Sequence, residues 1–342
     1  MKATLRRVTI VVPTYNEEKH IARTIGMLSR DDGFQDYDVI VCDGDSLDGT
    51  VEAAKMLGYP NLEIVRNAQR TQAAAVNLAA EMAWDRANRQ PAYLVRIDAH
   101  SVYPMNFVKS LIATAEIHGA DSVVVPMHTV EGNNVQKAAH VLFNSWLGNG
   151  GAAHRAHSTS QWVDHGHHAL FRLEAFLDVN GYDESFIANE DAELDHRLTR
   201  AGYRIYLDGD NSIGYIPRDS IASTWKQMRR NGFYRLKNLA KHAVTPKLRQ
   251  LLPILVLPFL LGVLFLTLIV SPAFLTLSLA YFAPVALLAW RDCGRFGFSS
   301  PHLRFTTFLL AIATHTGFSF GAAEFAVSHC RTLLSARTGV AK

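Results

Sequence analysis

The chain has few cysteines and little net charge, and both shortages exclude classes of protein. Its 342 residues include three cysteines, Cys42, Cys293 and Cys330, which are odd in number and share no metal-type spacing. We therefore expect neither a disulfide scaffold nor a cysteine-bound zinc site. The formal net charge is only +3, and no basic motif interleaved with aromatic residues is present, so we expect no nucleic-acid partner.

Two common nucleotide-binding motifs are also absent from the sequence. After the first predicted strand, where a dinucleotide-binding fold needs Gly-x-Gly-x-x-Gly, the chain has Pro13-Thr14-Tyr15-Asn16-Glu17-Glu18. No Walker A lysine motif occurs. These absences argue against NAD, FAD and a P-loop ATPase.

Charged residues are missing from one long window, residues 250–290, which contains no Asp, Glu, Lys, Arg or His. About 20 apolar residues span the roughly 30 Å hydrocarbon layer of a membrane, so this window excludes a fully soluble protein. We predict a hairpin, residues 251–290, made of two spans that meet at Ser271-Pro272. Arginines follow the hairpin, and the positive-inside rule places both of its ends in the cytoplasm.

A third apolar segment, residues 305–327, contains His315 and Glu324 and precedes a basic tail. A third crossing would carry that tail outside, against the positive-inside rule. Two alternatives stay open for this segment, a third span and a re-entrant or interfacial position.

Residues 219–249, directly before the hairpin, form a predicted amphipathic helix. They carry eight Lys or Arg against one Asp, with apolar residues at helical spacing on the other face. A basic helix at this place favours an interfacial position on anionic lipid head groups. The alternative is a core-packed helix with one solvated face.

The first half of the chain alternates short β-branched runs with helical patterns, which is typical of an α/β domain with a mixed, mostly parallel sheet. The predicted strands are residues 8–12, 39–42, 62–65, 93–97 and 122–125, and the predicted helices are residues 18–28, 50–57, 71–86 and 105–118. Loops at the carboxyl ends of such strands form the ligand crevice.

Acidic residues follow two of these strands. Asp43 comes after the second strand, where a carboxylate can accept hydrogen bonds from a base or a ribose, whereas its neighbours up to residue 48 are typical turn and cap residues. Asp98 follows the fourth strand, and His100 lies two residues on, so both can reach a divalent cation. Asp-x-His alone is a weak signal.

A third acidic position opens a later helix at Glu190-Asp191. Acids in a first turn are favoured by the helix dipole, so a capping pair is one interpretation. The functional interpretation is a general base that takes a proton from an attacking hydroxyl.

In their order along the chain, these residues resemble glycosyltransferase family 2, the inverting nucleotide-sugar enzymes with an A-type α/β fold. The resemblance covers about residues 8 to 240 and is carried by residues 8–18, the acidic turn 43–50, Ile97-Asp98-Ala99-His100, Asn189-Glu190-Asp191 with the helix that follows, and residues 197–203. More narrowly, the chain is similar to membrane-anchored enzymes that build bacterial exopolysaccharide repeats on a lipid carrier.

The resemblance implies a role for each matching residue. Asp98 would ligate a Mn²⁺ or Mg²⁺ ion that bridges the donor diphosphate, Asp191 would be the catalytic base, and Gln227, Arg230 and Glu190 would face the diphosphate or the acceptor. The residues that would hold the nucleotide are Pro13, Tyr15, Glu17, Asp43 and Arg70.

The chain departs from the family pattern in two places. His100 stands where the metal motif usually ends in Asp, and an imidazole favours manganese over magnesium. Processive relatives carry Gln-x-x-Arg-Trp, whereas Gln227 here opens a segment that has Asn231 in place of the Trp, so we expect single additions. Five crowded histidines lack a fixed ligand spacing, so we favour solvated or acceptor-lining roles over a zinc site; they are His154, His157, His165, His167 and His168.

Together these observations predict a catalytic domain (residues 1–218), an interfacial helix (219–249) and a membrane region (250–342). The expected function is transfer of a hexose, with glucose as the expected sugar, from a UDP-sugar to a polyprenyl-diphosphate-linked acceptor in exopolysaccharide biosynthesis of the succinoglycan type. The expected location is the bacterial inner membrane, with the catalytic domain in the cytoplasm. The expected partners are the lipid of that membrane and, as a further candidate, a polysaccharide assembly complex. The alternatives are a polyprenyl-phosphate sugar synthase and a non-catalytic scaffold of an export complex.

Overall fold

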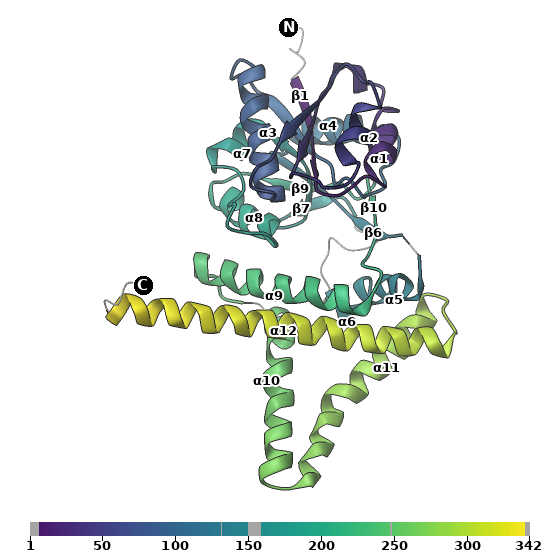
Figure 1. Ribbon diagram of the computed structural model, residues 1–342, viewed down its shortest axis with the longest axis vertical. Helices are drawn as coiled ribbons and strands as arrows, with labels where there is room; N and C mark the ends of the chain where they lie inside the picture. Colours follow the sequence, from purple (N-terminus) through teal and green to yellow (C-terminus); the bar gives the residue numbers. More distant parts are fainter. Residues whose placement is uncertain (1–6, 131, 150–158, 247, 339–342) are drawn as a thin grey trace. The chain divides into compact units, whose positions relative to one another are not determined.

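The computed structural model describes residues 7–130, 132–149, 159–246 and 248–338 (Figure 1). The chain divides into two compact units, which are described separately. The first holds the described residues of Met1–His128 and Ala153–Ile216, and the second those of Thr129–Ala152 and Pro217–Lys342. The functional division at residues 218 and 249 stays a prediction.

The first unit is built on an eight-stranded sheet with the strand order β3-β2-β1-β4-β8-β5-β9-β7. Strands β1 to β4 pair in parallel, as do β5 and β9, while β8 and β7 run antiparallel to their neighbours. The predicted mixed, mostly parallel sheet is therefore confirmed. The strands are β1 (Arg7–Thr14), β2 (Asp38–Asp43), β3 (Leu62–Arg66), β4 (Ala92–Arg96), β5 (Ser122–Val125), β7 (Gln161–Val163), β8 (His167–Arg172) and β9 (Ile205–Leu207); β6 (Met127–Thr129) and β10 (Ile213–Tyr215) form a small second sheet.

Helices cover both faces of this sheet (Figure 1). Successive side chains of a strand point to opposite faces. Ile10 and Val12 of β1 accordingly lie in one apolar core, and Val11 lies in the other. Burial on both faces explains why β1 is a continuous apolar run rather than an alternating one. The first core contains α1 (Ile21–Leu28), α2 (Thr50–Lys55) and α4 (Phe107–His118), with η1 (Phe34–Asp36); the second contains α3 (Gln72–Arg86), α7 (Leu173–Asp178) and α8 (Glu190–Arg200).

The second unit is helical. Its helices are α5 (Asn134–Phe143), α6 (Trp146–Asn149), α9 (Ile221–His242), α10 (Leu248–Ile269), η2 (Pro272–Ser278), α11 (Leu279–Arg295) and α12 (Pro301–Thr338). Within this unit α9 and α12 lie side by side, and α10 and α11 project away from that pair as a hairpin (Figure 1).

Glycines allow α9 and α12 to approach very closely. A Cβ atom at Gly232 of α9 would collide with the carbonyl of Phe318, and one at Gly321 of α12 would collide with the carbonyl of Arg229. Small residues at a helix interface let the two backbones come together and gain dispersion contacts. No local sequence pattern predicts this glycine-mediated packing.

Two segments of the described residues are long and apolar enough to cross a membrane, Leu251–Ile269 and Pro272–Arg295. A helix in the core of a soluble protein passes the same test, but its side chains would be covered. Here Phe265, Leu268 and Ile269 are 61%, 73% and 69% exposed. An apolar surface of this extent needs lipid or a partner, which supports membrane association.

Pro258 would break α10 in isolation, because it cannot donate to the carbonyl of Ile254 one turn earlier. The hydroxyl of Ser319 on α12 donates to that carbonyl at 2.6 Å and accepts from the amide of Leu257 at 3.0 Å. A neighbouring helix thus satisfies the groups that the proline leaves open, as expected for proline in such helices.

The helix α12 is 38 residues long, about 57 Å, and covers the third apolar segment. It is not among the candidate spans of the described residues. Its two ionisable residues in the segment have partners: His315 contacts the Tyr281 hydroxyl and the Leu147 carbonyl, both at 3.0 Å, and Glu324 pairs with Arg229. The topology of this segment stays a prediction.

Candidate active site

The loops that leave β1 and β2 are tied together around Asp43. The Thr14 hydroxyl donates to Asp43 Oδ1 at 3.2 Å, and Ser46 donates its hydroxyl to the same oxygen and its amide to Oδ2 at 2.6 and 2.9 Å. Asp43 is buried at the carboxyl end of β2. These contacts hold its carboxylate as a fixed acceptor at the edge where ligands bind to such sheets.

The next acid, Asp45, takes a left-handed backbone conformation with φ of 58°. Its carboxylate accepts from Arg66 Nε at 2.6 Å and from Arg70 Nη2 at 3.1 Å. Hydrogen bonds from these two arginines lower the pKa of Asp45 to about 2. Arg70, which the resemblance assigns to the nucleotide, is thus oriented by a carboxylate while its side chain remains 56% exposed.

The loop after β4 meets the loop after β1. His100 Nδ1 lies 2.8 Å from Glu17 Oε1, so the predicted metal and nucleotide residues are in direct contact. Tyr15, two residues before Glu17, is half exposed. Pro13 lies within β1 and pairs with Cys42 of β2 in the sheet register.

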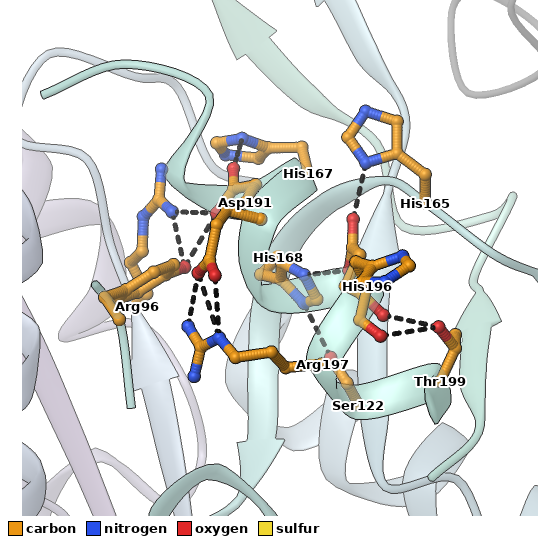
Figure 2. A network of polar contacts seen from close by, with 12 residues as sticks. Arg96, Ser122, His165, His167, His168, Asp191, His196, Arg197 and Thr199 are labelled. Atoms are coloured by element: carbon orange, nitrogen blue, oxygen red, sulfur yellow. Dashed lines mark hydrogen bonds and ion pairs between the residues drawn. The ribbon is translucent and has the colours of Figure 1, made fainter. Parts of the chain in front are cut away.

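Arg96, the last residue of β4, lies between the two predicted functional acids. Its Nη1 donates to Asp191 Oδ1 at 2.6 Å (Figure 2). Its Nε lies 3.5 Å from Asp98 Oδ1. The Arg96 side chain is only 4% exposed. One buried guanidinium therefore neutralises carboxylates from two distant parts of the chain.

Two further side chains complete this cluster. The Tyr182 hydroxyl donates to Asp191 Oδ1 at 2.7 Å and accepts from Arg96 Nη1 at 2.9 Å. His167, the first residue of β8, has Nδ1 at 3.8 Å from Asp191 Oδ2 (Figure 2). Its Nε2 lies 3.5 Å from Asp98 Oδ2. Asp191 Oδ1 is thus held by two donors, while Oδ2 lies at a longer distance from His167, its one ion-pair contact among the residues that the structure describes.

The acids of the cluster differ in the direction of their pKa shifts. Burial alone would raise the pKa of Asp191, but the charge of Arg96 outweighs it and holds that pKa well below its usual range. Burial would also raise the pKa of Asp98, but the charge of Arg96 lowers this pKa below its usual value. Burial and the adjacent charge of Asp191 raise the pKa of Glu190 to about 7. Burial lowers the pKa of His167, so this imidazole is neutral at neutral pH.

Asp191 lies in the first turn of α8, which begins at Glu190. Asn189 at the N-cap has φ of 58°, which asparagine tolerates, and makes no side-chain cap. One turn after Asp191, the buried Asp195 contacts both His165 and His168, and His168 Nδ1 lies 2.8 Å from the Ser122 hydroxyl (Figure 2). These contacts fix α8 against β5 and β8.

The structure brings most of the predicted site residues to one edge of the first unit. Asp43 is the last residue of β2, Asp98 follows β4, and Asp191 lies in the first turn of α8. Arg96 links Asp98 and Asp191. Gln227 and Arg230 lie on α9 in the other unit, so their role at the diphosphate or the acceptor stays a prediction.

The predicted site omits Arg96 and Tyr182, and it gives His167 a solvated or acceptor-lining role without its contacts to Asp98 and Asp191. Arg96 carried a usable signal, because an arginine in an otherwise apolar buried strand needs a carboxylate partner. Tyr182 and His167 carried none, since their roles depend on the pairing of β8 beside β4.

The predicted metal position has suitable donor types. Asp98 supplies a carboxylate and His100 an imidazole, which together suit Mn²⁺. In the part of the chain that the structure describes, no three or more His, Cys, Asp or Glu side chains are arranged to hold a metal ion. A cation bound by Asp98 and His100 would therefore need further ligands from the substrate or water.

The crowded histidines do not gather at one point. His165 and His168 face Asp195, whereas His167 faces Asp98 and Asp191. His154 and His157 lie outside the described residues.

The sheet order, its helical layers and the acids at its carboxyl edge define an A-type glycosyltransferase fold. A solved structure with the same fold is the mannosyltransferase PcManGT of Pyrobaculum calidifontis, in complex with GDP-Man and Mn²⁺. It is 19% identical, with a TM-score of 0.56, and the match covers 94% of this chain and 88% of that one.

The chain belongs to glycosyl transferase family 2, whose family model matches residues 9–179. It is 45% identical over 258 residues to the succinoglycan biosynthesis protein ExoA of Rhizobium meliloti (strain 1021). The aligned residues cover 75% of this chain and 77% of that protein. A second relative is a Methanococcus voltae dolichyl N-acetyl-alpha-D-glucosaminyl phosphate 3-beta-D-2,3-diacetamido-2,3-dideoxy-beta-D-glucuronosyltransferase. It is 23% identical over 235 residues, 64% of this chain and 70% of that protein. The resemblance predicted from the sequence is confirmed.

Proposed function

We propose that this chain is an inverting glycosyltransferase that moves a hexose, with glucose as the expected sugar, from a UDP-sugar to a polyprenyl-diphosphate-linked saccharide in exopolysaccharide biosynthesis. The observation that carries the proposal is the cluster of Asp98, Asp191 and Arg96 at the carboxyl edge of a family 2 domain. The 45% identity to the succinoglycan biosynthesis protein ExoA supports the exopolysaccharide pathway.

Asp191 is the proposed general base. It is ionised at neutral pH because Arg96 lowers its pKa. Arg96 and Tyr182 occupy Oδ1, so Oδ2 is the oxygen that accepts the proton of the acceptor hydroxyl. A base of this kind contributes about 10²- to 10⁴-fold to a rate.

Donor binding is assigned to the loops after β1 and β2. Asp43, held by Thr14 and Ser46, accepts from the nucleoside. The other residues proposed to hold it are Pro13, near the end of β1, and Tyr15 and Glu17, on the loop that follows. Arg70, oriented by Asp45, supplies a positive charge for the nucleotide phosphates.

Asp98 and His100 are the residues proposed to hold a divalent cation, Mn²⁺ or Mg²⁺. When bound, the cation supplies positive charge that stabilises the departing nucleoside diphosphate. The Mn²⁺ in the complex of the structurally similar mannosyltransferase supports this assignment. His167 contacts Asp98 and positions its carboxylate.

The candidate membrane hairpin explains how the enzyme meets a lipid-linked acceptor. Confining enzyme and acceptor to one surface raises their effective concentration. We propose the bacterial inner membrane as that surface, with the first unit in the cytoplasm, where nucleotide sugars are made available to it.

The test is transfer by membranes that contain the protein, incubated with radiolabelled nucleotide sugars and lipid extracts. Asp191→Asn keeps the shape of the side chain but removes the base, so we expect transfer to fall by about 10²-fold or more while UDP binding stays near normal. Retained turnover in this variant would overturn the assignment of the base. A labelled monosaccharide-phospholipid, in place of a lipid-linked oligosaccharide, would favour a polyprenyl-phosphate sugar synthase.

A further inference from the structure

A charged groove lies in the second unit, between the glycine-packed helices α9 and α12. Its volume is about 310 Å³, and its lining residues are Lys226, Arg229, Arg230, Phe233, Tyr234 and Glu324. We call it the α9 groove. Binding sites for small molecules have volumes of about 300–1,000 Å³, so this groove suits a head group better than a whole nucleotide sugar.

The cations of the groove share one face of α9. Lys226, Arg229 and Arg230 are spaced by three and four residues, and Phe233 and Tyr234 continue the same face one turn later. The lining contains three cations and one carboxylate, an excess of two positive charges. That excess complements a diphosphate better than a neutral sugar.

Arg229 is fixed in place. Its Nε donates to Glu324 Oε2 at 2.6 Å, and its guanidinium lies 5.3 Å from the ring centre of Phe320. Lys226 and Arg230 are exposed, and neither makes an ion pair with the residues that the structure describes. The groove therefore combines one positioned cation with two cations available to an anion.

The groove is linked directly to the candidate membrane spans. Helix α9 ends at His242 and α10 begins at Leu248, and α10 packs on α12 within the same unit. A phosphate at the head of a lipid lies at the membrane surface, next to the start of such a span. A free nucleotide has no reason to prefer this place.

We propose that the α9 groove binds the diphosphate head group of an isoprenoid-linked acceptor. The inference rests on the proposed function, since it assigns the acceptor of that reaction to a site in the second unit. Lys226 and Arg230 donate to the diphosphate oxygens, and Phe233 and Tyr234 cover the first isoprene units.

The first experiment measures binding, without catalysis. The full-length protein is titrated with geranylgeranyl diphosphate in phosphatidylcholine nanodiscs, and the double variant Lys226→Gln/Arg230→Gln is compared with the wild type. Loss of two charge-assisted contacts predicts affinity weakened by about tenfold or more. The matched control is Arg235→Gln/Lys241→Gln, which removes two positive charges from α9 outside the groove and leaves the affinity within about threefold.

Three outcomes would overturn the inference. An equal loss of affinity in the control variant would show that diffuse surface charge, and not the groove, binds the diphosphate. Tight, groove-dependent binding of inorganic pyrophosphate, or of phosphatidylglycerol vesicles, would assign the site to a free phosphate or to bulk lipid. Weakened UDP binding in the groove variant would assign it to the donor.

A second experiment separates this inference from the proposed function. In the transfer assay the groove variant should raise the KM for the lipid acceptor and leave the KM for the nucleotide sugar unchanged. Transfer with an unchanged acceptor KM would refute the groove alone. Groove-dependent binding of geranylgeranyl diphosphate, by a protein that transfers no sugar, would refute the proposed function alone.

Discussion

The Arg96 cluster of the first unit and the α9 groove of the second unit hold their charges in opposite ways. In the first unit Arg96 is buried and shared by Asp98 and Asp191, whereas in the second unit Lys226 and Arg230 are exposed at the α9 groove. A buried charge with fixed partners is costly to separate from them, and an exposed charge is screened by salt and free to meet a ligand. The first arrangement suits chemistry that needs fixed geometry, and the second suits capture of an anion.

The largest effect is expected from breaking the buried cluster. Arg96→Leu leaves two carboxylates without their counter-charge, so we expect the free energy of unfolding of the first unit to fall by about 3 kcal/mol. Sugar transfer should be lost as well, because Asp191 loses the donor that holds Oδ1 and lowers its pKa. Thermal unfolding of the detergent-solubilised protein, with the transfer assay, measures both.

The control for this variant is Arg89→Leu. Arg89 pairs with Asp85 at 3.7 Å, but both side chains are more than 70% exposed. Exposed ion pairs contribute little to stability, so we expect the free energy of unfolding to change by no more than about 0.5 kcal/mol. A similar loss of stability in both variants would contradict the contrast between buried and exposed charge.

A smaller effect is expected from the helix packing beside the groove. Gly321→Ala places a Cβ atom inside the carbonyl of Arg229, so α9 and α12 must separate, at a cost of about 1–3 kcal/mol. The Arg229–Glu324 pair should be disturbed too, which weakens geranylgeranyl diphosphate binding in the nanodisc titration. Gly262→Ala on α10 is the matched control, because its added Cβ meets no atom within 4 Å. Tolerance of Gly321→Ala would show that the two backbones are not in close contact.

The elements of the first unit could be predicted because each has a local pattern. The run Val8–Val12, predicted as a strand, lies within β1. The helix predicted at residues 71–86 begins at Gln72, because Thr71 is its N-cap and accepts a hydrogen bond from the Ala74 amide. Strands β7, β9 and β10 could not be predicted, since three residues carry too little periodicity.

The site was predictable only in part. Acids at strand ends can be read from the sequence, because the topology of a parallel sheet brings those ends together. The contacts of Arg96 with Tyr182 and of His167 with Asp98 join positions 86 and 69 residues apart. They depend on β8 running antiparallel beside β4, which no local pattern encodes.

The smallest effect is expected from Glu190, which lies next to Asp191 of the Arg96 cluster. Its pKa is raised from 4.5 to about 7 by burial and by the charge of Asp191, so the folded state binds a proton that the unfolded state has released between those values. Stability conferred by this protonation falls as pH rises from about 4.5 to about 7 and is constant above it. Glu190→Gln removes the titration. Below pH 4.5 the Tm of the variant should match that of the wild type, and between pH 4.5 and about 7 the Tm of the variant should rise relative to that of the wild type. A difference in Tm that does not vary with pH would show that the pKa of Glu190 is not raised in the folded state.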